Sequence, residues 1–267
     1  MVNRNPEISV IMSVYNHENS VGDAIDSIIN QTFQNFEFII INDGSSDGSL
    51  NIINKYKKLD SRIIVIDQKN LGLTKSLNIG LQKSKANFIA RQDADDCSHL
   101  RRLEAQLKII KKFQLDIITS RAIKNSKIVP HSFIINCNQQ NILKTGNIFI
   151  HGTFFFRKYI FYKQKYDEKY KYAQDFKFML DIFKNNFKVG YILKPLYFLS
   201  NDHTSISNTK KYEQDKFVSK ALKSFYGSDK YFLIINKFSN IFKKILKVLF
   251  IIYLYIISSS GKFTIIK

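Results

Sequence analysis

Residues 8–44, which read ISVIMSVYNHENSVGDAIDSIINQTFQNFEFIIINDG, decide the fold. Two apolar runs, Ile8–Val14 and Phe36–Ile41, have the length and the β-branched composition of buried strands. Between them, apolar residues recur at helical spacing over residues 24–29. The stretch therefore predicts a strand, a helix and a second strand, the repeating unit of a parallel α/β sheet.

The same alternation continues to about residue 122. We expect further strands at Ile63–Ile66 and Phe88–Ala90 and from Asp116–Thr119, and helices around Leu50–Tyr56, Leu73–Leu81 and Leu103–Ile110. Ser20, with Asp23 three residues later, resembles a capping box at the start of the first helix. This order predicts an α/β fold with a mainly parallel sheet, whose ligands bind at the carboxyl ends of the strands.

A less regular region follows from about residue 147 to 207. We expect a strand at Ile148–Phe156, a polar loop at Tyr166–Tyr172, a helix at Phe176–Phe183 and a strand at Val189–Leu199 that is broken by Pro195. This region is expected to be a second subdomain on the same sheet.

The composition excludes several classes of protein. With 45% hydrophobic and 24% charged residues, the 267-residue chain can bury a normal core and is not intrinsically disordered. Two cysteines exclude a disulfide scaffold and a zinc ribbon, and suggest a reducing compartment. We expect no signal peptide and no membrane-spanning helix. The glycine-rich signatures of dinucleotide dehydrogenases and P-loop NTPases do not occur.

The net charge of +19 is unevenly distributed. Residues 1–100 carry 10 basic and 12 acidic side chains, residues 101–207 carry 19 and 7, and residues 208–267 carry 12 and 3. The acidic first part contains the Asp-rich turns and suggests a metal–phosphate site. The basic remainder would face an anionic partner such as a membrane surface, unless it is simply solvated surface.

Polar residues stand at the expected strand ends. These are Tyr15 and Asn16 after the first strand, Asp43 after the second, and Asp93 and Asp95 after the fourth. Two carboxylates at i and i+2 on a tight turn can face one Mg²⁺ or Mn²⁺ ion, which also binds phosphate oxygens. Asp43 could accept a hydrogen bond from a nucleotide base or ribose. The alternatives are an ordinary Asp-rich turn at Asp93 and Asp95 and a simple helix N-cap at Asp43.

Four sequence blocks in this order resemble those of the family 2 glycosyltransferases, inverting enzymes with the GT-A fold. The blocks are Ser9–Asn16, Ile41–Asp47, Asn70–Gly80 and Ala90–Asp96, the last followed by Arg102-Leu103-Glu104-Ala105-Gln106. Together they cover roughly residues 7–122. Weaker matches at His151-Gly152, Gln174-Asp175 and His203 extend the resemblance to about residue 207.

The resemblance implies transfer of a sugar from a nucleotide diphosphate sugar, usually UDP-linked, to an acceptor hydroxyl. It implies a GT-A domain over residues 1–207, with a nucleotide-sugar half at about 1–122 and an acceptor half at 123–207. By analogy, Tyr15, Asn16 and Asp43 hold the nucleotide, Arg91 helps to hold the donor, and Asp93 and Asp95 contact the ribose and the metal-bound diphosphate. Of these two carboxylates, we expect Asp93 to bind the donor and Asp95 to bind the metal.

An inverting transfer also needs a general base for the acceptor proton. The family places it in a Glu-Asp pair at a helix start, which reads Gln174-Asp175 here, so the resemblance makes Asp175 the base. We expect the helix start to lower the pKa of Asp175. His203 is a candidate ligand of the metal or contact of the diphosphate. Asn201 stands where the family often has Arg, which puts donor contacts from that loop in doubt.

The C-terminal residues 208–267 predict a basic helical tail. Residues 230–267 contain seven Lys and no acidic residue, and the polar positions from Asn236 to Lys247 recur every three or four residues. Val248–Ile257 is apolar throughout but too short to span a bilayer. We expect peripheral association with an anionic inner membrane face, close to a lipid-linked acceptor for surface polysaccharide such as lipopolysaccharide or capsule. The alternative is packing on the domain or a dimer contact.

Three other functions compete with this interpretation. A sugar nucleotidyltransferase would share the metal–phosphate chemistry, but its glycine-rich basic loop is absent after the first strand. A catalytically silent nucleotide-sugar-binding or scaffold subunit is suggested by Gln174 and Asn201. A nucleic-acid platform would suit the net charge, but carboxylates at the strand ends would repel phosphate without a metal, so no nucleic-acid partner is expected.

Overall fold

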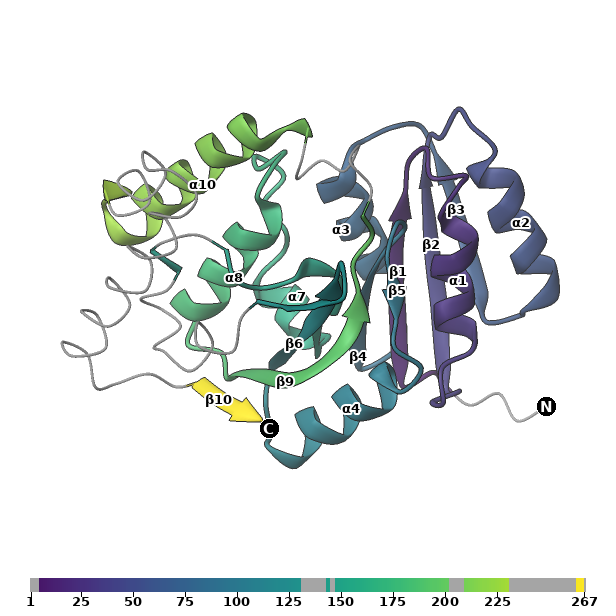
Figure 1. Ribbon diagram of the computed structural model, residues 1–267, viewed down its shortest axis with the longest axis horizontal. Helices are drawn as coiled ribbons and strands as arrows, with labels where there is room; N and C mark the ends of the chain where they lie inside the picture. The colour runs from purple at the N-terminus through teal and green to yellow at the C-terminus, as the bar shows by residue number, and fades with distance from the viewer. Residues whose placement is uncertain (1–4, 131–142, 145–146, 202–208, 231–262, 267) are drawn as a thin grey trace.

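The computed structural model describes residues 5–130, 143–144, 147–201, 209–230 and 263–266. These residues form one mixed sheet with helices against both faces (Figure 1). In chain order the elements are β1 (Ile8–Val14), α1 (Val21–Ile29), β2 (Phe36–Asp43), α2 (Ser49–Leu59), β3 (Ile63–Gln68), α3 (Leu73–Lys83), β4 (Phe88–Asp93), β5 (Cys97–Ser98), α4 (Arg102–Lys112), β6 (Ile117–Lys124), β7 (Lys127–Val129), η1 (His151–Thr153), β8 (Phe155–Arg157), α7 (Tyr159–Lys163), α8 (Gln174–Lys184), β9 (Val189–Phe198), α10 (Lys211–Tyr226) and β10 (Phe263–Ile266).

The strand order is β10-β9-β6-β8-β4-β1-β2-β3, with β5 paired to β9 and β7 paired to β6. Strands β4, β1, β2 and β3 form one parallel block, and β6, β9 and β10 form another. Strand β8 runs antiparallel to β4 and β6 and joins the two blocks. The predicted α/β fold with a mainly parallel sheet is therefore confirmed.

The register brings the predicted strand ends together. Val14 lies opposite Asn42, and Ser13 lies opposite Asp93 on the other side of β1. Because these strands are parallel, the residues that follow them emerge at the same edge of the sheet. Tyr15, Asn16, Asp43 and Asp93 therefore lie along one edge.

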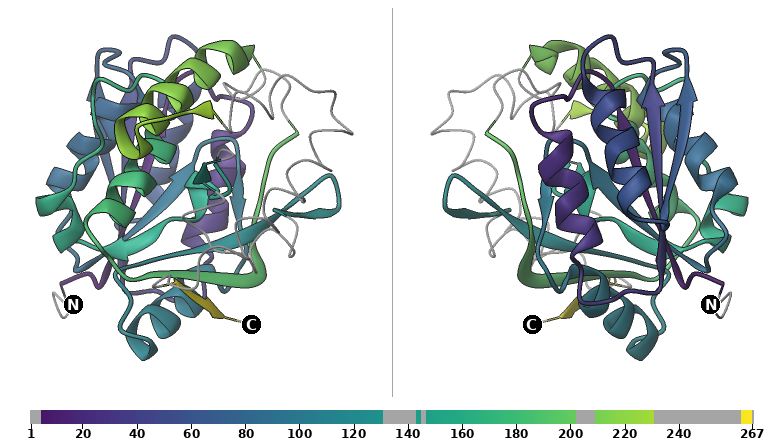
Figure 2. Two further views of the ribbon diagram at one scale, coloured as in Figure 1. Left: turned by 90° about the vertical axis from the view of Figure 1, so that its left-hand side faces the viewer. Right: turned by 90° about the vertical axis from the view of Figure 1, so that its right-hand side faces the viewer.

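Both faces of the central strands are buried, which explains their nearly continuous apolar sequence. On β1, Val10 and Met12 belong to the core shared with α1, α2 and α4, while Ile11 belongs to the core shared with α3, α8 and α10. The alternation of successive side chains between two faces divides the strand in this way. Figure 2 shows the helices on both sides of the sheet.

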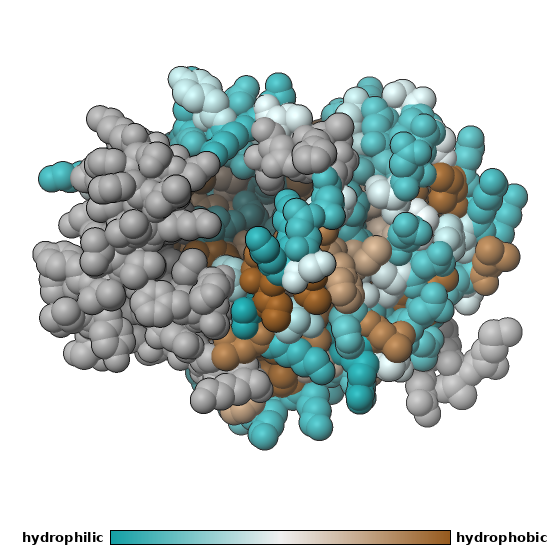
Figure 3. Space-filling view, viewed as in Figure 1, coloured by the Kyte–Doolittle hydropathy of each residue, from teal (hydrophilic) through white to brown (hydrophobic). Residues whose placement is uncertain are grey.

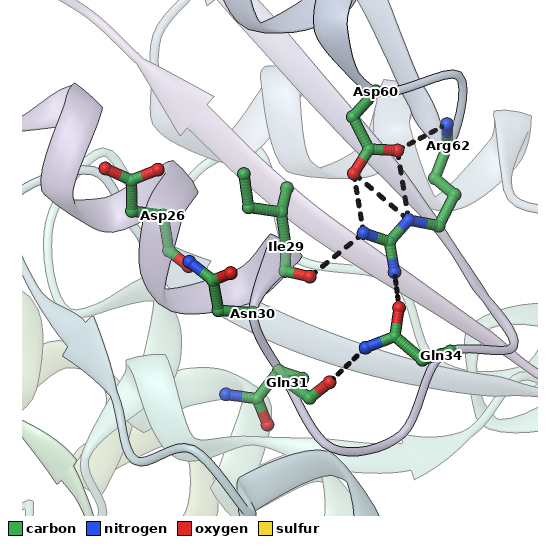
Figure 4. Close-up of polar contacts among 7 residues, drawn as sticks. All are labelled: Asp26, Ile29, Asn30, Gln31, Gln34, Asp60 and Arg62. Carbon is green, nitrogen blue, oxygen red and sulfur yellow. Dashed lines mark hydrogen bonds and ion pairs between the residues drawn. The ribbon is translucent and has the colours of Figure 1, made fainter.

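A polar network closes the opposite edge, where the strands begin (Figure 4). The Arg62 guanidinium donates to Asp60, to Gln34 Oε1 at 2.6 Å and to the carbonyl of Ile29 at 2.9 Å. It also lies 4.3 Å from the ring centroid of Phe36. The network connects the end of α1, the start of β2 and the turn before β3, far from the carboxyl-end edge.

The predicted strand at Ile148–Phe156 is wrong. Only Phe155–Arg157 forms β8, and His151–Thr153 is a 3₁₀ turn closed by hydrogen bonds from Thr153 N–H to Ile150 O and from Phe154 N–H to His151 O. A Cβ added to Gly152 would lie 2.2 Å from Tyr197 Oη, so a glycine is required in this turn. The apolar run is buried, but its burial does not come from strand pairing.

Four smaller expectations also change. Strand β4 continues past Ala90 to Asp93, and β6 begins at Ile117 and runs to Lys124. Pro195 does not interrupt β9, because it lies where the pairing with β6 shifts register opposite Arg121. Ser20 does not cap α1 with its side chain. Its hydroxyl donates instead to the carbonyl of Ala94 at 3.1 Å, which links the start of α1 to the Asp-rich turn.

The described part of the C-terminal region contains a helix and a strand. Val218, Ala221 and Leu222 on α10 are buried in the core that also contains α8, and Figure 2 shows the two helices side by side. Residues 263–266 are not helical, since β10 pairs in parallel with β9. Within the described ranges, no helix is long and apolar enough to cross a membrane. Most of the segment predicted to bind membranes, residues 231–262, lies outside the described residues.

Where Figure 3 shows described residues, the surface is mainly polar, with apolar side chains gathered near the middle of the face. Leu100 and Phe198 are among the exposed large apolar residues, and the ring of His99 stacks on Phe198 with centroids 6.4 Å apart.

Candidate active site

Two loops at the carboxyl-end edge are connected to each other by hydrogen bonds. The Asn16 side-chain oxygen accepts from Ser46 N–H at 2.8 Å, and the Glu18 carboxylate accepts from Gly48 N–H at 2.7 Å. In the other direction, Glu18 N–H donates to Asp47 at 3.0 Å. Asn16 has a left-handed backbone with φ 56°, which Asn tolerates better than most residues. The loops after β1 and β2 therefore form one unit, and the Tyr15 ring beside it is 49% exposed.

Asp43 accepts hydrogen bonds from a third loop, which joins β3 to α3. Its Oδ1 accepts from Leu71 N–H at 2.8 Å and from Gln68 Nε2 at 2.9 Å, and its Oδ2 accepts from Gly72 N–H at 2.9 Å. Gly44, with φ +73°, allows this approach, since an added Cβ would lie 2.5 Å from Asn70 N. Asp43 is buried, and Gly48 rather than Asp43 precedes α2, so the N-cap alternative for Asp43 is wrong.

Arg91 and Asp93 form an ion pair at the end of β4. Arg91 Nη2 donates to Asp93 Oδ1 at 2.6 Å, and the guanidinium is almost fully buried. Its Nε and Nη1 find no hydrogen-bond partner among the described residues. Arg91 also lines a small cavity with Tyr166 and five apolar side chains. The pair leaves Asp93 partly exposed and gives this edge a buried cation close to its carboxylates.

The Asp-rich turn crowds three carboxyl groups. Burial and the neighbouring Asp93 raise the pKa of Asp95 above its ordinary value. The same two causes, together with Asp95, raise the pKa of Asp96 to about 8, although Asp96 Oδ1 accepts from Ser200 N–H at 2.7 Å. Crowded carboxylates of this kind favour either a proton or a bound cation.

These carboxyl oxygens are the hard donors that Mg²⁺ and Mn²⁺ prefer, and a cation would relieve the repulsion between Asp93, Asp95 and Asp96. The donor atoms of the turn therefore fit the predicted Mg²⁺ or Mn²⁺ ion. Within the described ranges, however, no three His, Cys, Asp or Glu side chains converge as a ligand set. The predicted ligand His203 lies outside the described residues.

Asp175 stands in the first turn of α8, two residues after the N-cap residue Ala173, which has a left-handed φ of 54°. Its Oδ2 accepts from Asn147 Nδ2 at 2.6 Å. Burial raises the pKa of Asp175 to about 6, and Asp93 adds to the rise, while N–H groups of the helix start and Asn147 oppose it. The helix start does lower the pKa, as expected, but the net pKa is raised rather than lowered because desolvation outweighs those hydrogen bonds.

His151 and Tyr166 complete the surroundings of Arg91. His151 Nε2 and Tyr166 Oη are 2.8 Å apart, and the Tyr166 ring stacks on Phe178 with centroids separated by 4.5 Å. Burial, followed by the Arg91 cation, lowers the pKa of His151 to about 3. His151 is thus a neutral side chain near neutral pH, beside the Arg91–Asp93 pair.

Several residues near the site escaped the sequence prediction. Tyr197 Oη accepts from Asp93 N–H at 3.0 Å, and Arg102 Nη1 donates to the carbonyls of Arg91 at 2.9 Å and Gly152 at 2.7 Å. Burial lowers the pKa of Arg102 to about 10. Arg102 lies in a block that matches the family, which was the available signal. Asn147 and Tyr166 had no signal, because only the fold brings them to Asp175 and His151.

The structure thus brings together Arg91, Asp93, His151, Tyr166 and Asp175. The Asp93 carboxylate influences the pKa of His151, Tyr166 and Asp175, and the Arg91 cation influences the pKa of His151 and Tyr166. Tyr15, Asn16 and Asp43 follow the neighbouring strands at the same edge. Of the predicted site residues, His203 alone falls outside the described ranges.

Comparison with known families identifies the class of this fold and site. Residues 9–171 match the model of the Glycosyl transferase family 2, which covers more than half of the chain. The chain therefore belongs to this family, as the four sequence blocks predicted.

Individual relatives agree with this assignment. Glycosyltransferase GlyA of Streptococcus pneumoniae is 40% identical over 111 residues, which cover 42% of this chain and 16% of GlyA. EpsE of Bacillus subtilis is 33% identical over 160 residues, which cover 56% of each protein. The chain thus spans from about a sixth to just over half of the length of these two relatives.

Solved structures share the fold. S. aureus TarS 1–349, in complex with UDP-GlcNAc, superposes with a TM-score of 0.67 at 20% identity, over 91% of this chain and 71% of that one. The mannosyltransferase PcManGT from Pyrobaculum calidifontis, in complex with GDP-Man and Mn²⁺, gives a TM-score of 0.62 at 13% identity, over 97% and 77%.

Proposed function

We propose that this chain is a metal-dependent inverting glycosyltransferase that moves a sugar from a nucleotide diphosphate sugar, namely a UDP-linked sugar, to an acceptor hydroxyl. The observation that carries the proposal is Asp175, a carboxyl group with a pKa raised to about 6, beside the Arg91–Asp93 pair at the carboxyl-end edge. A base with a pKa of this size is ionised at neutral pH and still able to accept a proton.

The donor is proposed to bind on the loops after β1, β2 and β4. The exposed Tyr15 ring offers a surface for the nucleotide base, and Asn16 and Asp43 fix the loops on either side of it. Arg91 offers positive charge close to the donor, and Asp93 orients its buried guanidinium. Structural neighbours bind UDP, UDP-GlcNAc and GDP-Man, which supports a nucleotide-sugar donor.

A divalent cation, when bound, would neutralise charge on the diphosphate leaving group. Asp95 is the carboxylate proposed to hold it, with His203 as a second ligand. The raised pKa values of Asp95 and Asp96 and the Mn²⁺ of the PcManGT structure support this part of the proposal.

In the transfer itself, Asp175 accepts the proton of the acceptor hydroxyl as that oxygen attacks the anomeric carbon. The bond between the anomeric carbon and the diphosphate oxygen breaks, and the electron pair leaves with the nucleotide diphosphate. Asp93, paired with Arg91, raises the pKa of Asp175, and the hydrogen-bonded His151–Tyr166 pair lies close to Arg91. Attack opposite the leaving group inverts the anomeric configuration.

Calorimetric titration tests the donor site. UDP, GDP and dTDP are titrated with and without Mn²⁺ into the wild type and Asp95→Ala. We expect one diphosphate to bind only with the metal, and the variant to lose that binding. If none binds under any condition, the assignment of Asp43, Asp93 and Asp95 is wrong. A silent binding subunit, suggested by Gln174 and Asn201, would bind the diphosphate but would not hydrolyse donor without acceptor.

We further propose peripheral association with the inner face of the cell membrane and a lipid-linked acceptor in surface-glycan synthesis. The Lys-rich segment after residue 230 supports this proposal, whereas the apolar side of α10 is already used for packing on the domain. Co-sedimentation with vesicles tests it. The full chain should sediment with phosphatidylglycerol vesicles and not with phosphatidylcholine vesicles, and Lys243→Gln/Lys244→Gln/Lys247→Gln should weaken sedimentation. Equal behaviour with both lipids would contradict it.

A further inference from the structure

One amide side chain is fixed against the proposed base. Asn147 Nδ2 donates to Asp175 Oδ2 at 2.6 Å, while Asn147 Oδ1 accepts from Phe149 N–H at 2.9 Å. A main-chain N–H can only donate, so the amide oxygen must face Phe149 and the amide nitrogen must face Asp175. The second bond therefore determines the orientation of the amide in the first.

The groups around Asp175 show why the hydrogen bond from Asn147 matters for the orientation of its carboxylate. The groups that face the carboxylate are the N–H of Phe176 on its own helix, Asp93 at the end of β4 and Tyr166 from the loop before α8, with Arg91 paired to Asp93. Asp93 repels the Asp175 carboxylate. Asn147 is the side chain of the described residues that donates to it.

We propose that Asn147 is a positioning residue for the Asp175 base, holding Oδ2 so that Oδ1 is presented to the acceptor hydroxyl. This inference rests on the proposed function. In the step itself, the proton of the acceptor hydroxyl passes to Asp175 Oδ1 while the new bond to the anomeric carbon forms and the bond to the diphosphate breaks. Asn147 donates its hydrogen bond throughout and exchanges no proton.

The freedom of the Asp175 side chain explains why its carboxylate needs a positioning residue. Asp175 is the second residue of α8, and its carboxylate can rotate about the side-chain torsions unless something holds it. Loss of geometry at a reacting group reduces rate far more than binding. A variant at Asn147 should therefore change kcat for donor hydrolysis and leave the KM for donor unchanged.

The kinetic test compares Asn147→Ala, Asn147→Asp and the matched control Asn185→Ala. Asn185 lies at the other end of α8, where its amide bonds the carbonyl of Asp181 and the side chain of Gln164. We expect Asn147→Ala to lower kcat about 10- to 100-fold at constant KM and to move the acid limb of the pH profile to higher pH, since a hydrogen bond to the ionised form is lost. Asn147→Asp should move the limb further, and Asn185→Ala should match the wild type.

A second measurement does not depend on turnover. The ¹³C carboxyl resonance of Asp175, assigned with Asp175→Asn, is titrated with pH in the wild type and in Asn147→Ala. The apparent pKa should rise in the variant. Should the alanine variant fail to fold, Asn147→Ser, which keeps a donor on a shorter side chain, should show a smaller rise and a smaller loss of kcat.

The outcomes separate the two proposals. If Asp175→Asn hydrolyses donor as fast as the wild type, the base assignment and the proposed function fail, whatever Asn147 does. If Asp175→Asn is inactive while Asn147→Ala keeps the wild-type kcat, pH profile and Asp175 pKa, the positioning role alone is overturned.

Discussion

The two parallel blocks of the sheet hold their site residues in different ways. In the first block, β4-β1-β2-β3, the loops at the carboxyl-end edge bond to one another, as Asn16 does to Ser46 and Asp43 to Leu71 and Gly72. Around the second block, β6-β9-β10, Asp175 on α8 bonds to the side chain of Asn147, and His151 on η1 bonds to the side chain of Tyr166. Bonds from main-chain N–H groups to side chains thus shape the donor side, and bonds between side chains shape the acceptor side.

Arg102 connects the two blocks, so its removal should have the largest effect on stability. Its guanidinium is fully buried and donates to the carbonyl of Arg91 in the first block and of Gly152 beside the second. Arg102→Ala should lower the free energy of unfolding by about 3–5 kcal/mol, because it leaves a cavity and two unpaired carbonyls. Urea unfolding measures this change. Arg101→Ala, which removes an exposed ion pair with Glu104, should change little. Equal effects of the two variants would contradict a connecting role.

Asp43→Asn tests the donor side on its own. Asp43 uses both oxygens to accept from the loop, and Asn would put an NH₂ group against Leu71 or Gly72. We expect a loss of about 1–3 kcal/mol in stability, and about ten-fold weaker binding of UDP with Mn²⁺. Asp67→Asn is the matched control, since Asp67 is exposed and accepts one side-chain bond from Asn42. Binding by Asp43→Asn equal to that of the control would show that the loop does not shape the donor site.

Gly152→Ala tests the acceptor side. Its new Cβ would lie 2.2 Å from Tyr197 Oη, which accepts from Asp93 N–H, so Tyr197 must move. We expect a loss of about 1–3 kcal/mol, part of which Tyr197→Phe should restore in the double variant. By contrast, Gly22→Ala in α1 of the first block meets nothing closer than 3.7 Å and should gain about 0.5–1 kcal/mol. Thermal unfolding of the four variants separates these outcomes.

The smallest expected effect is the change of kcat/KM and of stability with pH. Asp175 must be ionised to act as a base, so kcat/KM for donor should be full above the pKa of about 6 and fall below it. Because this folded-state pKa lies above the unfolded value, the contribution of Asp175 to stability is lost as the pH rises through about 6. Asp175→Asn should therefore flatten the pH dependence of unfolding. A pH–rate profile with no acid limb near 6 would argue against Asp175 as the base.

The sequence was sufficient to predict the first block, because apolar runs of strand length and glycine-containing turns act over a few residues. The second block was harder. The run before β8 is as apolar as a strand, yet it forms a turn because Gly152 fits under Tyr197, which is distant in the chain. The pKa of Asp175 was predicted in the wrong direction, because the sequence shows a helix start but not the burial around it. Asn147 could not have been found for the same reason.

The most direct test of the central claim compares binding and turnover in Asp175→Asn. The claim is that the first block binds the donor and that the second supplies the base. We expect the variant to bind UDP with Mn²⁺ as the wild type does, because the donor loops are unchanged. We also expect its hydrolysis of donor, followed by chromatography of released UDP, to fall by about 10²- to 10⁴-fold. Binding with unchanged turnover would contradict the account.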